Sequence, residues 1–120
     1  MARIKAILRR APLAEHLAEE APVEASGVRV DRVRHEVRVD GEEVELPPKE
    51  FELLAYLIEN AGRVLTRGQL IDEIWGSDYV GDTKTLDVHV RRLRTRIEAD
   101  PKEPARIQTV RGVGYRFSDR

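Results

Sequence analysis

The sequence contains no cysteine, and its aromatic residues are limited to one tryptophan, three tyrosines and two phenylalanines. Without cysteine the chain offers no disulfides, no thiol nucleophile and no cysteine-based zinc site. No apolar run approaches the ~20 residues that a helical membrane span requires. The basic residues of segment 1–10 are not followed by the apolar run of a secretory signal. These absences predict a cytoplasmic protein without a membrane partner, a metal or another cofactor.

A surplus of basic charge is also missing, because the formal net charge is −1 over 120 residues. Nucleic-acid-binding domains usually carry such a surplus. The charges are nevertheless segregated along the chain. Residues 28–83 carry seven basic and thirteen acidic side chains, whereas residues 84–116 carry nine basic and four acidic ones. The second region therefore has a local excess of positive charge that the whole-chain value hides.

Arginine accounts for 17 of the 21 basic residues. Its planar guanidinium matches the edge of guanine and the oxygens of phosphate better than the lysine ammonium does. A GC-rich genome, which favours arginine codons, would produce the same bias. The bias is therefore compatible with nucleic-acid binding without establishing it.

The N-terminal residues differ in pattern from the rest of the chain. Residues 1–10 place their apolar side chains on one helical face, but the segment is too short to be stable alone. Residues 11–27 are rich in alanine and glutamate and contain two prolines, as linkers do. We interpret residues 1–27 as the end of a helix followed by a linker, and residues 28–120 as the folded domain.

Two regions of this domain alternate apolar and polar residues, which is typical of β-strands. The first predicts a small antiparallel sheet over residues 28–46. Asp40-Gly41 lies between two of its apolar runs and favours a tight hairpin turn, because both residues tolerate positive φ. The second region, residues 107–110 and 114–117, predicts a hairpin around a glycine-containing turn.

Apolar residues at helical spacing predict three helices between these regions. The first begins at Pro48 and ends at Gly62. The second begins after Thr66, which forms a capping box with Gln69, and ends near Trp75.

The third helix follows a loop at residues 76–82, is capped by Asp82 or Thr83, and ends near Ala99. Wound at roughly 100° per residue, it has one apolar stripe that we assign to the core. This stripe consists of Leu86, Val90, Leu93 and Ile97.

The opposite side of the third helix is basic. It carries Lys84, Asp87, Val88, Arg91, Arg92, Arg94 and Arg96. An ordinary solvated face, which is the alternative, would interleave glutamate with arginine at i,i+4 spacing and would avoid an apolar β-branched residue at its centre. In a DNA major groove, arginine pairs with guanine, aspartate accepts from cytosine, and a small apolar side chain contacts the thymine methyl. This side therefore favours binding to double-stranded DNA.

The order of elements supports the same prediction. A helix, a loop and an arginine-rich helix follow one another as in a helix-turn-helix, although the loop of about seven residues is longer than usual. The hairpin that follows, here called the wing (residues 107–117), has Arg111 at its turn beside Gly112 and Gly114. Arg111 is placed to reach a phosphate or the minor groove. A plain turn with a solvent-facing arginine is the alternative.

Other classes of function have weaker support. None of the three serines lies in the strand-turn-helix context of a catalytic nucleophile, and the Gly112–Gly114 pair opens a strand and not a phosphate-binding helix. We therefore do not expect an enzyme. The basic side lacks the interleaved aromatic residues that RNA-binding surfaces use for stacking. A winged-helix protein-interaction module without specific DNA binding is the main alternative.

Four segments carry a resemblance to a known family: LPPKEFELLAYL, GRVLTRGQLIDEIWG, TKTLDVHVRRLRTRIE and IQTVRGVGYRF. From Val28 to Phe117 the chain resembles the winged-helix effector domain of OmpR/PhoB-type response regulators. The segment ARIKAILRR resembles the last helix of the receiver domain that precedes this effector, and the receiver itself is absent from the sequence. The resemblance implies an α+β winged helix-turn-helix with an N-terminal antiparallel sheet, three helices and a C-terminal wing. It implies a bacterial transcription regulator in a two-component phosphorelay.

The resemblance also assigns roles to matching residues. The residues implied to read DNA bases are Arg92, Asp87 and Val88. Those implied to contact the DNA backbone are Trp75, Lys84, Thr85, His89, Arg91, Arg94 and Thr109. Arg111 would enter the minor groove, and loop 76–82 would contact RNA polymerase through Asp78 and Tyr79. Such proteins bind direct repeats as tandem dimers, and a sensor kinase acts on them through the receiver.

Several of these residues have structural alternatives. These are a core or half-buried position for Trp75, a surface position for His89, an ion pair of Arg94 with Glu98, and a contact of Asp87 with Arg91. The sequence also departs from the family at Pro47, where a threonine or serine often caps the first helix. We expect this change to cost up to ~1 kcal/mol of capping energy.

Overall fold

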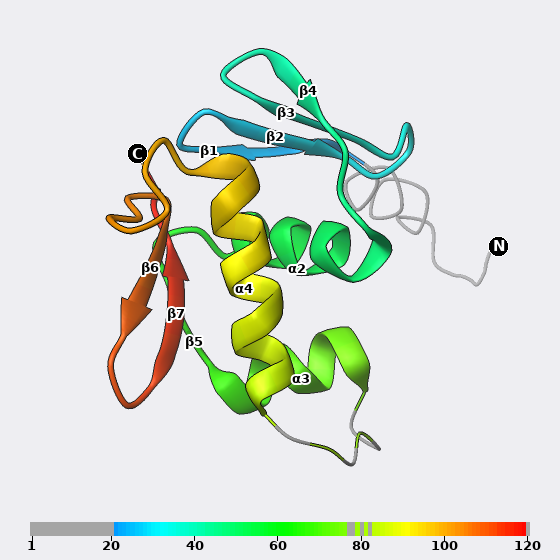
Figure 1. Cartoon of the computed structure of the whole chain (residues 1–120). Coiled ribbons are helices and arrows are strands. Elements are labelled where there is room, and N and C mark those ends of the chain that lie inside the picture. Colours follow the sequence, from blue (N-terminus) through cyan, green and yellow to red (C-terminus); the bar gives the residue numbers. More distant parts are fainter. Residues whose placement is uncertain (1–20, 77–78, 80, 82, 120) are drawn as a thin grey trace, which may run out of the picture.

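The computed structural model describes residues 21–76, 79, 81 and 83–119. An antiparallel sheet comes first, helices follow, and a second sheet is completed by the C-terminal hairpin (Figure 1). This is the α+β order that the sequence predicted. The predicted helix over residues 1–10 and most of the predicted linker lie outside the described residues.

The N-terminal sheet has four antiparallel strands in the order β1-β2-β3-β4, and the first of them precedes the predicted region 28–46. They are β1 (Val23–Ala25), β2 (Val28–Asp31), β3 (Glu36–Val39) and β4 (Glu42–Val44). The hairpin turn predicted at Asp40-Gly41 is confirmed, with φ of 52° and 88°.

Strand β1 corrects the predicted extent of the linker. It pairs with β2, so that Val23 lies opposite Val30. Ser26 and Gly27 have φ of 52° and 81° and form the turn between the two strands. The sequence did not reveal this because serine and glycine occur both in flexible linkers and in tight turns. A strand of three residues is also too short to show alternation.

Helices α2 (Pro48–Glu59) and α3 (Arg67–Trp75) begin where the sequence predicted. The N-cap of α2 is Pro47, which makes no side-chain capping hydrogen bond, as expected. The capping box of α3 is confirmed. The Gln69 N–H donates to Thr66 Oγ1 at 3.1 Å, and the Thr66 N–H donates to Gln69 Oε1 at 2.8 Å.

Helix α4 (Lys84–Ile97) is slightly shorter than predicted. Thr83 has a helical φ and ψ of −65° and −10° and makes no capping hydrogen bond, so the capping predicted for it is wrong. The other candidate, Asp82, lies outside the described residues. At the C-terminal end, the extended Glu98 uses its carboxylate to accept hydrogen bonds of 2.8–3.1 Å from the backbone of residues 105–107. This contact turns the chain away from the helix axis.

The second sheet has the strand order β5-β7-β6. Its strands are β5 (Val64–Thr66), β6 (Ile107–Val110) and β7 (Gly114–Phe117), and the bounds predicted for the wing hairpin are confirmed. A Cβ atom on Gly114 would lie 2.0 Å from the carbonyl oxygen of Leu65. Glycine is therefore required for β7 to approach β5 this closely.

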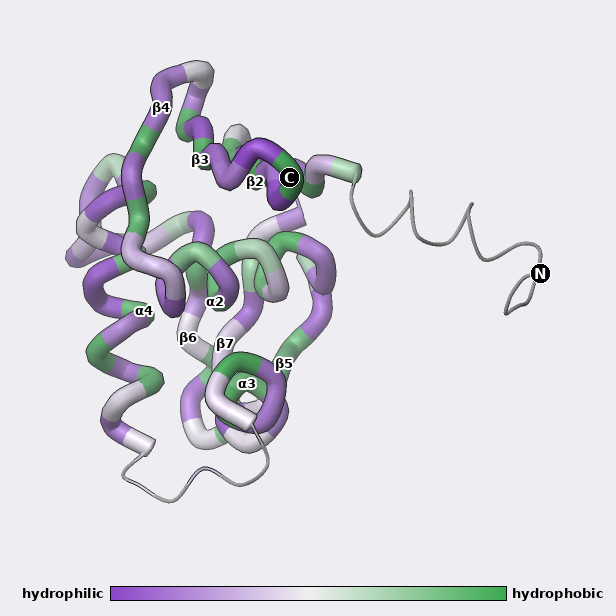
Figure 2. The backbone as a smooth tube through the Cα atoms, turned by 90° about the vertical axis from the view of Figure 1, so that its right-hand side faces the viewer, coloured by the Kyte–Doolittle hydropathy of each residue, from purple (hydrophilic) through white to green (hydrophobic). Residues whose placement is uncertain are grey.

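The core lies where the helices pack between the two sheets (Figure 1). The stripe of α4 predicted to be buried is confirmed, because each of its four residues is at most 1% exposed. Hydrophobic and hydrophilic residues alternate along each turn of α4 in Figure 2, as expected for a helix with one buried face. Burial of this stripe determines which α4 side chains face outward. None of the helices in the described part of the chain is long and apolar enough to cross a membrane.

Arg106 attaches the N-terminal sheet to the end of α4. Its guanidinium donates to both carboxylate oxygens of Asp40 at 3.0 Å, to the carbonyl oxygen of Ser26 at 2.7 Å, and to the carbonyl oxygen of Ile97. Its side chain is only 15% exposed. Two of the sheet's hairpin turns, at Ser26-Gly27 and at Asp40-Gly41, are therefore held against the segment that joins α4 to the wing.

Candidate nucleic-acid interface

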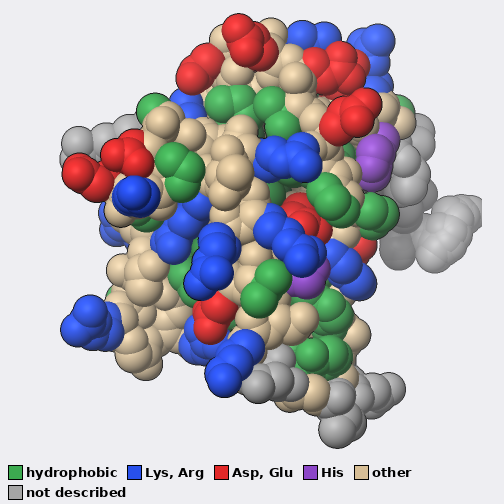
Figure 3. All heavy atoms as spheres, in the orientation of Figure 1, with side chains coloured by type: hydrophobic (Ala, Val, Ile, Leu, Met, Phe, Trp, Pro, Cys, Tyr) green, Lys and Arg blue, Asp and Glu red, His purple; other side chains and the backbone are tan. Residues whose placement is uncertain are grey.

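The outward side of α4 is a continuous exposed surface. Its exposed residues are Lys84, Val88, Arg91, Arg92, Thr95 and Arg96. Figure 3 shows lysine and arginine side chains gathered over the middle of this face of the molecule, whereas acidic side chains gather over the N-terminal sheet. The segregation of charge along the sequence is therefore also a segregation in space. Val88 is 41% exposed among the cations, although it is apolar.

Arg92, a predicted base reader, projects from α4 with its side chain 64% exposed. Its Nη1 atom lies 3.8 Å from Oε1 of Glu50, a residue in the first turn of α2 whose side chain is only 3% exposed. Sequence reasoning gave no role to Glu50. The contact joins residues far apart in the chain, so the spacing of residues within either helix did not predict it.

Asp87, a predicted base reader, is engaged within the protein. Its carboxylate accepts hydrogen bonds from Arg67 of α3 at 2.6 and 3.1 Å and from the Tyr115 hydroxyl of β7 at 2.6 Å. The hydrogen bonds from Arg67 hold the pKa of Asp87 below its ordinary value. Burial, followed by the hydrogen bond to Asp87, raises the pKa of Tyr115. The alternative that Asp87 orients Arg91 finds no hydrogen bond among the described residues.

Sequence reasoning missed the two partners of Asp87. Arg67 lies inside the predicted capping box and Tyr115 inside a predicted strand, and neither motif indicates a bond to Asp87. The sequence shows that both side chains can donate hydrogen bonds. That they meet at Asp87 depends on how α3, α4 and β7 pack together. Together the three residues connect the helix-turn-helix to the wing.

Arg94 faces the wing and is only partly exposed. Its Nε and Nη2 atoms donate to the carbonyl oxygen of Ile107 at 3.2 and 2.8 Å, and Nη2 also donates to Thr109 Oγ1 at 2.8 Å. The guanidinium lies 5.5 Å from the centre of the Tyr115 ring. The alternative pairing with Glu98 does not form, because the Glu98 carboxylate binds backbone N–H groups. Arg94 and Thr109, two predicted DNA-backbone contacts, therefore bind each other.

Trp75 and His89 form a half-buried contact between α3 and α4. Their ring centres are 5.0 Å apart in an edge-to-face arrangement. The His89 side chain is 16% exposed, and its Nδ1 lies 2.7 Å from the carbonyl oxygen of Thr85, which accepts a hydrogen bond there. The ammonium of Lys49 lies 5.9 Å from the centre of the Trp75 ring. The burial of Trp75 thus matches the alternative of a half-buried position. His89 is more buried than the surface position that was its alternative.

The remaining predicted residues are Arg111 of the wing and two residues of loop 76–82, Asp78 and Tyr79. Arg111 is exposed beside Gly112, whose φ of 78° shapes the turn of the wing. Tyr79, a predicted contact for RNA polymerase, is half-buried, and its ring centre lies 6.2 Å from that of Trp75. Asp78 lies outside the described residues. No group of acidic, histidine or cysteine residues in the described part of the chain is arranged to hold a metal ion.

Helices α3 and α4 with the β6–β7 hairpin define a winged helix-turn-helix domain, as the sequence predicted. Residues 41–117 match the family described as transcriptional regulatory protein, C terminal. The chain belongs to this family of DNA-binding effector domains of OmpR/PhoB-type response regulators. The predicted family and fold class are thereby confirmed.

Curated relatives extend beyond this chain. The sensory transduction protein RegX3 of Mycobacterium tuberculosis strain H37Rv is 58% identical over 117 residues, which cover 98% of this chain and 52% of the relative. The phosphate regulon transcriptional regulatory protein PhoB of Pseudomonas aeruginosa is 42% identical over 118 residues, which cover 98% and 49%. The chain spans about half the length of these two relatives.

Solved structures have the same fold. The response regulator DrrB of Thermotoga maritima, described as an OmpR/PhoB homologue, superposes with a TM-score of 0.77 at 34% identity over 90% of this chain and 50% of its own. The RstA DNA-binding domain of Klebsiella pneumoniae, solved in complex with the RstA box, gives a TM-score of 0.74 at 32% identity over 82% and 98%.

Proposed function

We propose that this chain binds double-stranded DNA sequence-specifically, with α4 in the major groove and Arg111 of the wing in the minor groove. The observation that carries this proposal is the exposed row of cations around Val88 on a helix whose opposite side is buried. Such a row repels itself in isolation and is stabilised by phosphates. The likeness to the RstA domain, which was solved with its DNA box, supports the proposal.

The predicted DNA contacts fall into two groups by their surroundings. Arg91, Arg92 and Val88 are exposed on α4 and reach outward without rearrangement of the fold. Asp87 and Arg94 make hydrogen bonds within the protein. We infer that Arg92 and Val88 read bases directly. The Asp87 carboxylate accepts a hydrogen bond from a base only through lone pairs that Arg67 and Tyr115 do not already use.

The other predicted backbone contacts are Trp75, Lys84, Thr85, His89 and Thr109, with Arg91 and Arg94. We propose that they contact phosphates from the rim of the surface. Phosphate contacts place the domain on the duplex, and base contacts determine the sequence that it selects. The surface therefore combines a positioning rim with a narrow base-reading centre.

We further propose that the complete protein is a cytoplasmic response regulator whose receiver domain, controlled by a sensor kinase, precedes this effector. The lengths of the relatives support this arrangement, because the chain matches about half of each. In that protein, two effector domains would occupy a direct repeat in tandem, and loop 76–82 would contact RNA polymerase. We infer no enzymatic activity for the effector itself.

Selection of binding sites from random duplexes tests this function. We expect the chain to enrich a common sequence, with direct repeats about one helical turn apart. We also expect log affinity for the enriched duplex to fall linearly with log salt concentration, because phosphate contacts release counterions. The proposal would be overturned if no sequence is enriched, or if the affinity for the duplex does not change with salt concentration. The second result would favour the alternative of a protein-interaction module.

A further inference from the structure

Glu50 is an unusual residue in this fold because it is the one charged side chain that is buried among the described residues. The residue is 2% exposed, and its Oε1 atom has no hydrogen-bond partner in the described part of the chain. An ionised carboxylate is costly to bury unless it is paired and hydrogen-bonded. The fold therefore maintains a buried acceptor whose hydrogen bonds are not complete.

The local sequence explains why this carboxylate has no backbone partner. Glu50 is the third residue of α2, the position from which a glutamate normally accepts a hydrogen bond from the N-cap N–H. Here the N-cap is Pro47 and the next residue is Pro48, and neither has an N–H. Helix α3 shows the contrast, because Gln69 at the same position makes this bond to Thr66. The two prolines leave the Glu50 carboxylate directed away from its own backbone.

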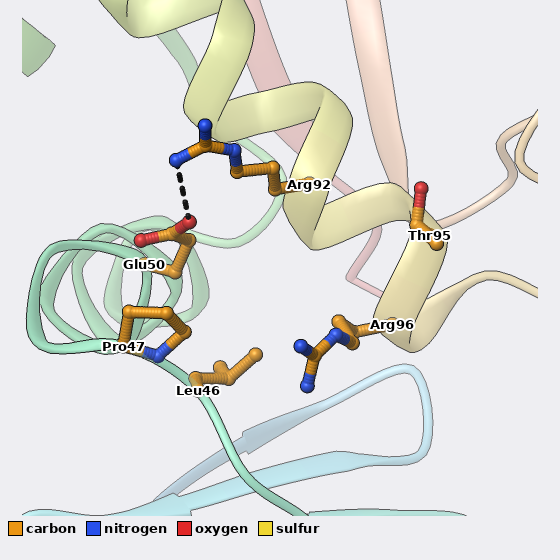
Figure 4. A pocket seen from close by; sticks show the side chains of 6 residues that line it. All are labelled: Leu46, Pro47, Glu50, Arg92, Thr95 and Arg96. Carbon is orange, nitrogen blue, oxygen red and sulfur yellow. Dashed lines mark ion pairs between the residues drawn. The ribbon is translucent and has the colours of Figure 1, made fainter.

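The carboxylate faces α4. Oε1 lies 3.8 Å from Nη1 of Arg92, and Oε2 lies 3.9 Å from Nε2 of His89. Both separations exceed the usual hydrogen-bond length. Figure 4 shows Glu50 and Arg92 on facing sides of a pocket of about 380 Å³ between α2 and α4. A small movement of the Arg92 guanidinium would complete the hydrogen bond.

We propose that Glu50 is a positioning residue for Arg92, which sets the guanidinium in one orientation for base reading. This proposal rests on the proposed function of Arg92. A guanidinium has five N–H donors, and bidentate pairing with guanine uses only two of them. One of the remaining donors is available to the Glu50 carboxylate. Docking on DNA expels water from this site, which strengthens the hydrogen bond.

The expected effect concerns discrimination between sites more than overall affinity. A fixed orientation reduces the ordering cost of Arg92 on a cognate base and penalises bases that require another orientation. The negative charge of Glu50 at the same time opposes the phosphates. A purely structural role, in which Glu50 only complements the N-terminal dipole of α2, would change stability but not discrimination.

Glu50→Gln tests the proposal, with Glu52→Gln as its matched control. Glu52 is an exposed acid on the same helix, so both variants lose one negative charge. Fluorescence anisotropy would measure affinity for three probes. These are the duplex enriched by the wild-type chain, the same duplex with each G·C pair changed to A·T in turn, and a scrambled duplex. We expect Glu50→Gln to lower the affinity ratio of enriched to substituted duplex by roughly 2- to 12-fold, the range for immobilising one such side chain. Glu52→Gln should leave this ratio unchanged.

Repeating Glu50→Gln in an Arg92→Ala background isolates the pair. Without Arg92, the loss of Glu50 should have no further effect on discrimination. An unchanged ratio in Glu50→Gln, or an equal loss with and without Arg92, would overturn the positioning role. Thermal unfolding monitors each variant. If Glu50→Gln does not fold, Glu50→Asp replaces it. This variant retains the charge but withdraws it by one methylene, and it should also reduce discrimination. An unchanged affinity ratio in Glu50→Asp would again overturn the role. A wild-type chain that binds enriched and scrambled duplexes equally would instead overturn the proposed function.

Discussion

Replacement of Tyr115 by phenylalanine tests whether Asp87 ties the wing to α4. The Tyr115 hydroxyl donates to Asp87 at 2.6 Å, and the residue is only 7% exposed. A hydrogen bond to a charged group contributes about 1.5–3 kcal/mol. The Asp87 side chain is 43% exposed, so water replaces part of the lost bond. We therefore expect a loss of about 1 kcal/mol in the free energy of unfolding, equivalent to a decrease of roughly 4–8 °C in Tm.

Urea unfolding followed by the fluorescence of Trp75 measures this loss. Tyr56→Phe on α2 is the control, because it removes a tyrosine hydroxyl elsewhere in the fold. Asp87→Asn and the double variant complete a cycle, whose coupling energy reports the interaction itself. If Tyr115→Phe is no more destabilising than Tyr56→Phe, and if the two single effects at Asp87 and Tyr115 simply add, the proposed tie does not stabilise the fold.

The same variants separate the two functions proposed for Asp87. Tyr115→Phe leaves the carboxylate in place, so it should reduce stability while discrimination between the enriched and substituted duplexes is retained. Asp87→Asn replaces one acceptor oxygen by a donor and should reduce both properties if Asp87 also reads a base. Equal discrimination by the two variants would show that Asp87 acts only within the protein.

Three further predictions concern other contacts. Arg92→Ala should reduce discrimination between sites by about 1–3 kcal/mol, whereas Arg94→Ala should weaken binding to all duplexes alike and lower the salt slope by about one. Identical behaviour of the two variants across a site library would contradict these roles. Thr66→Ala should destabilise the domain by about 1 kcal/mol in urea unfolding, because it removes the capping box of α3. Arg67 lowers the pKa of Asp87, so its stabilising effect is present at neutral pH and is lost as pH falls from about 4 through the folded-state value. Asp87→Asn should therefore flatten the acid side of the stability curve in pH-dependent thermal unfolding.

The features that the sequence predicted well are local ones. The turn at Asp40-Gly41, the capping box at Thr66 and the wing hairpin each depend on residues a few positions apart. The buried stripe of α4 depends on one helical period and was equally accessible. The family resemblance added predicted roles for individual side chains, which periodicity alone does not supply.

The features that were missed join segments far apart in the chain. Glu50 meets Arg92 across two helices, and Arg67 meets Asp87 across the loop between α3 and α4. Neither pair produces a periodic pattern in the sequence. The sequence gives the type of each side chain but not the angle at which the helices cross. The Arg94–Glu98 pair failed for the opposite reason. The local spacing was correct, but backbone N–H groups beyond the helix end bound the Glu98 carboxylate instead.

Arg92 and Arg94 show how one helix combines recognition with rigidity. They are two residues apart, so they leave α4 in directions that differ by about 160° around the helix axis. Arg92 projects toward Glu50 of α2, whereas Arg94 donates to the backbone of β6 at Ile107. Asp87 adds a third attachment, to α3 and β7. The helix is therefore held on both flanks, and its angle to the wing is set before DNA arrives. Such preorganisation reduces the ordering cost of binding. It also explains why neighbouring arginines of one basic helix need not contribute equally: Arg92 is directed at the ligand, and Arg94 also fixes the geometry in which Arg92 acts.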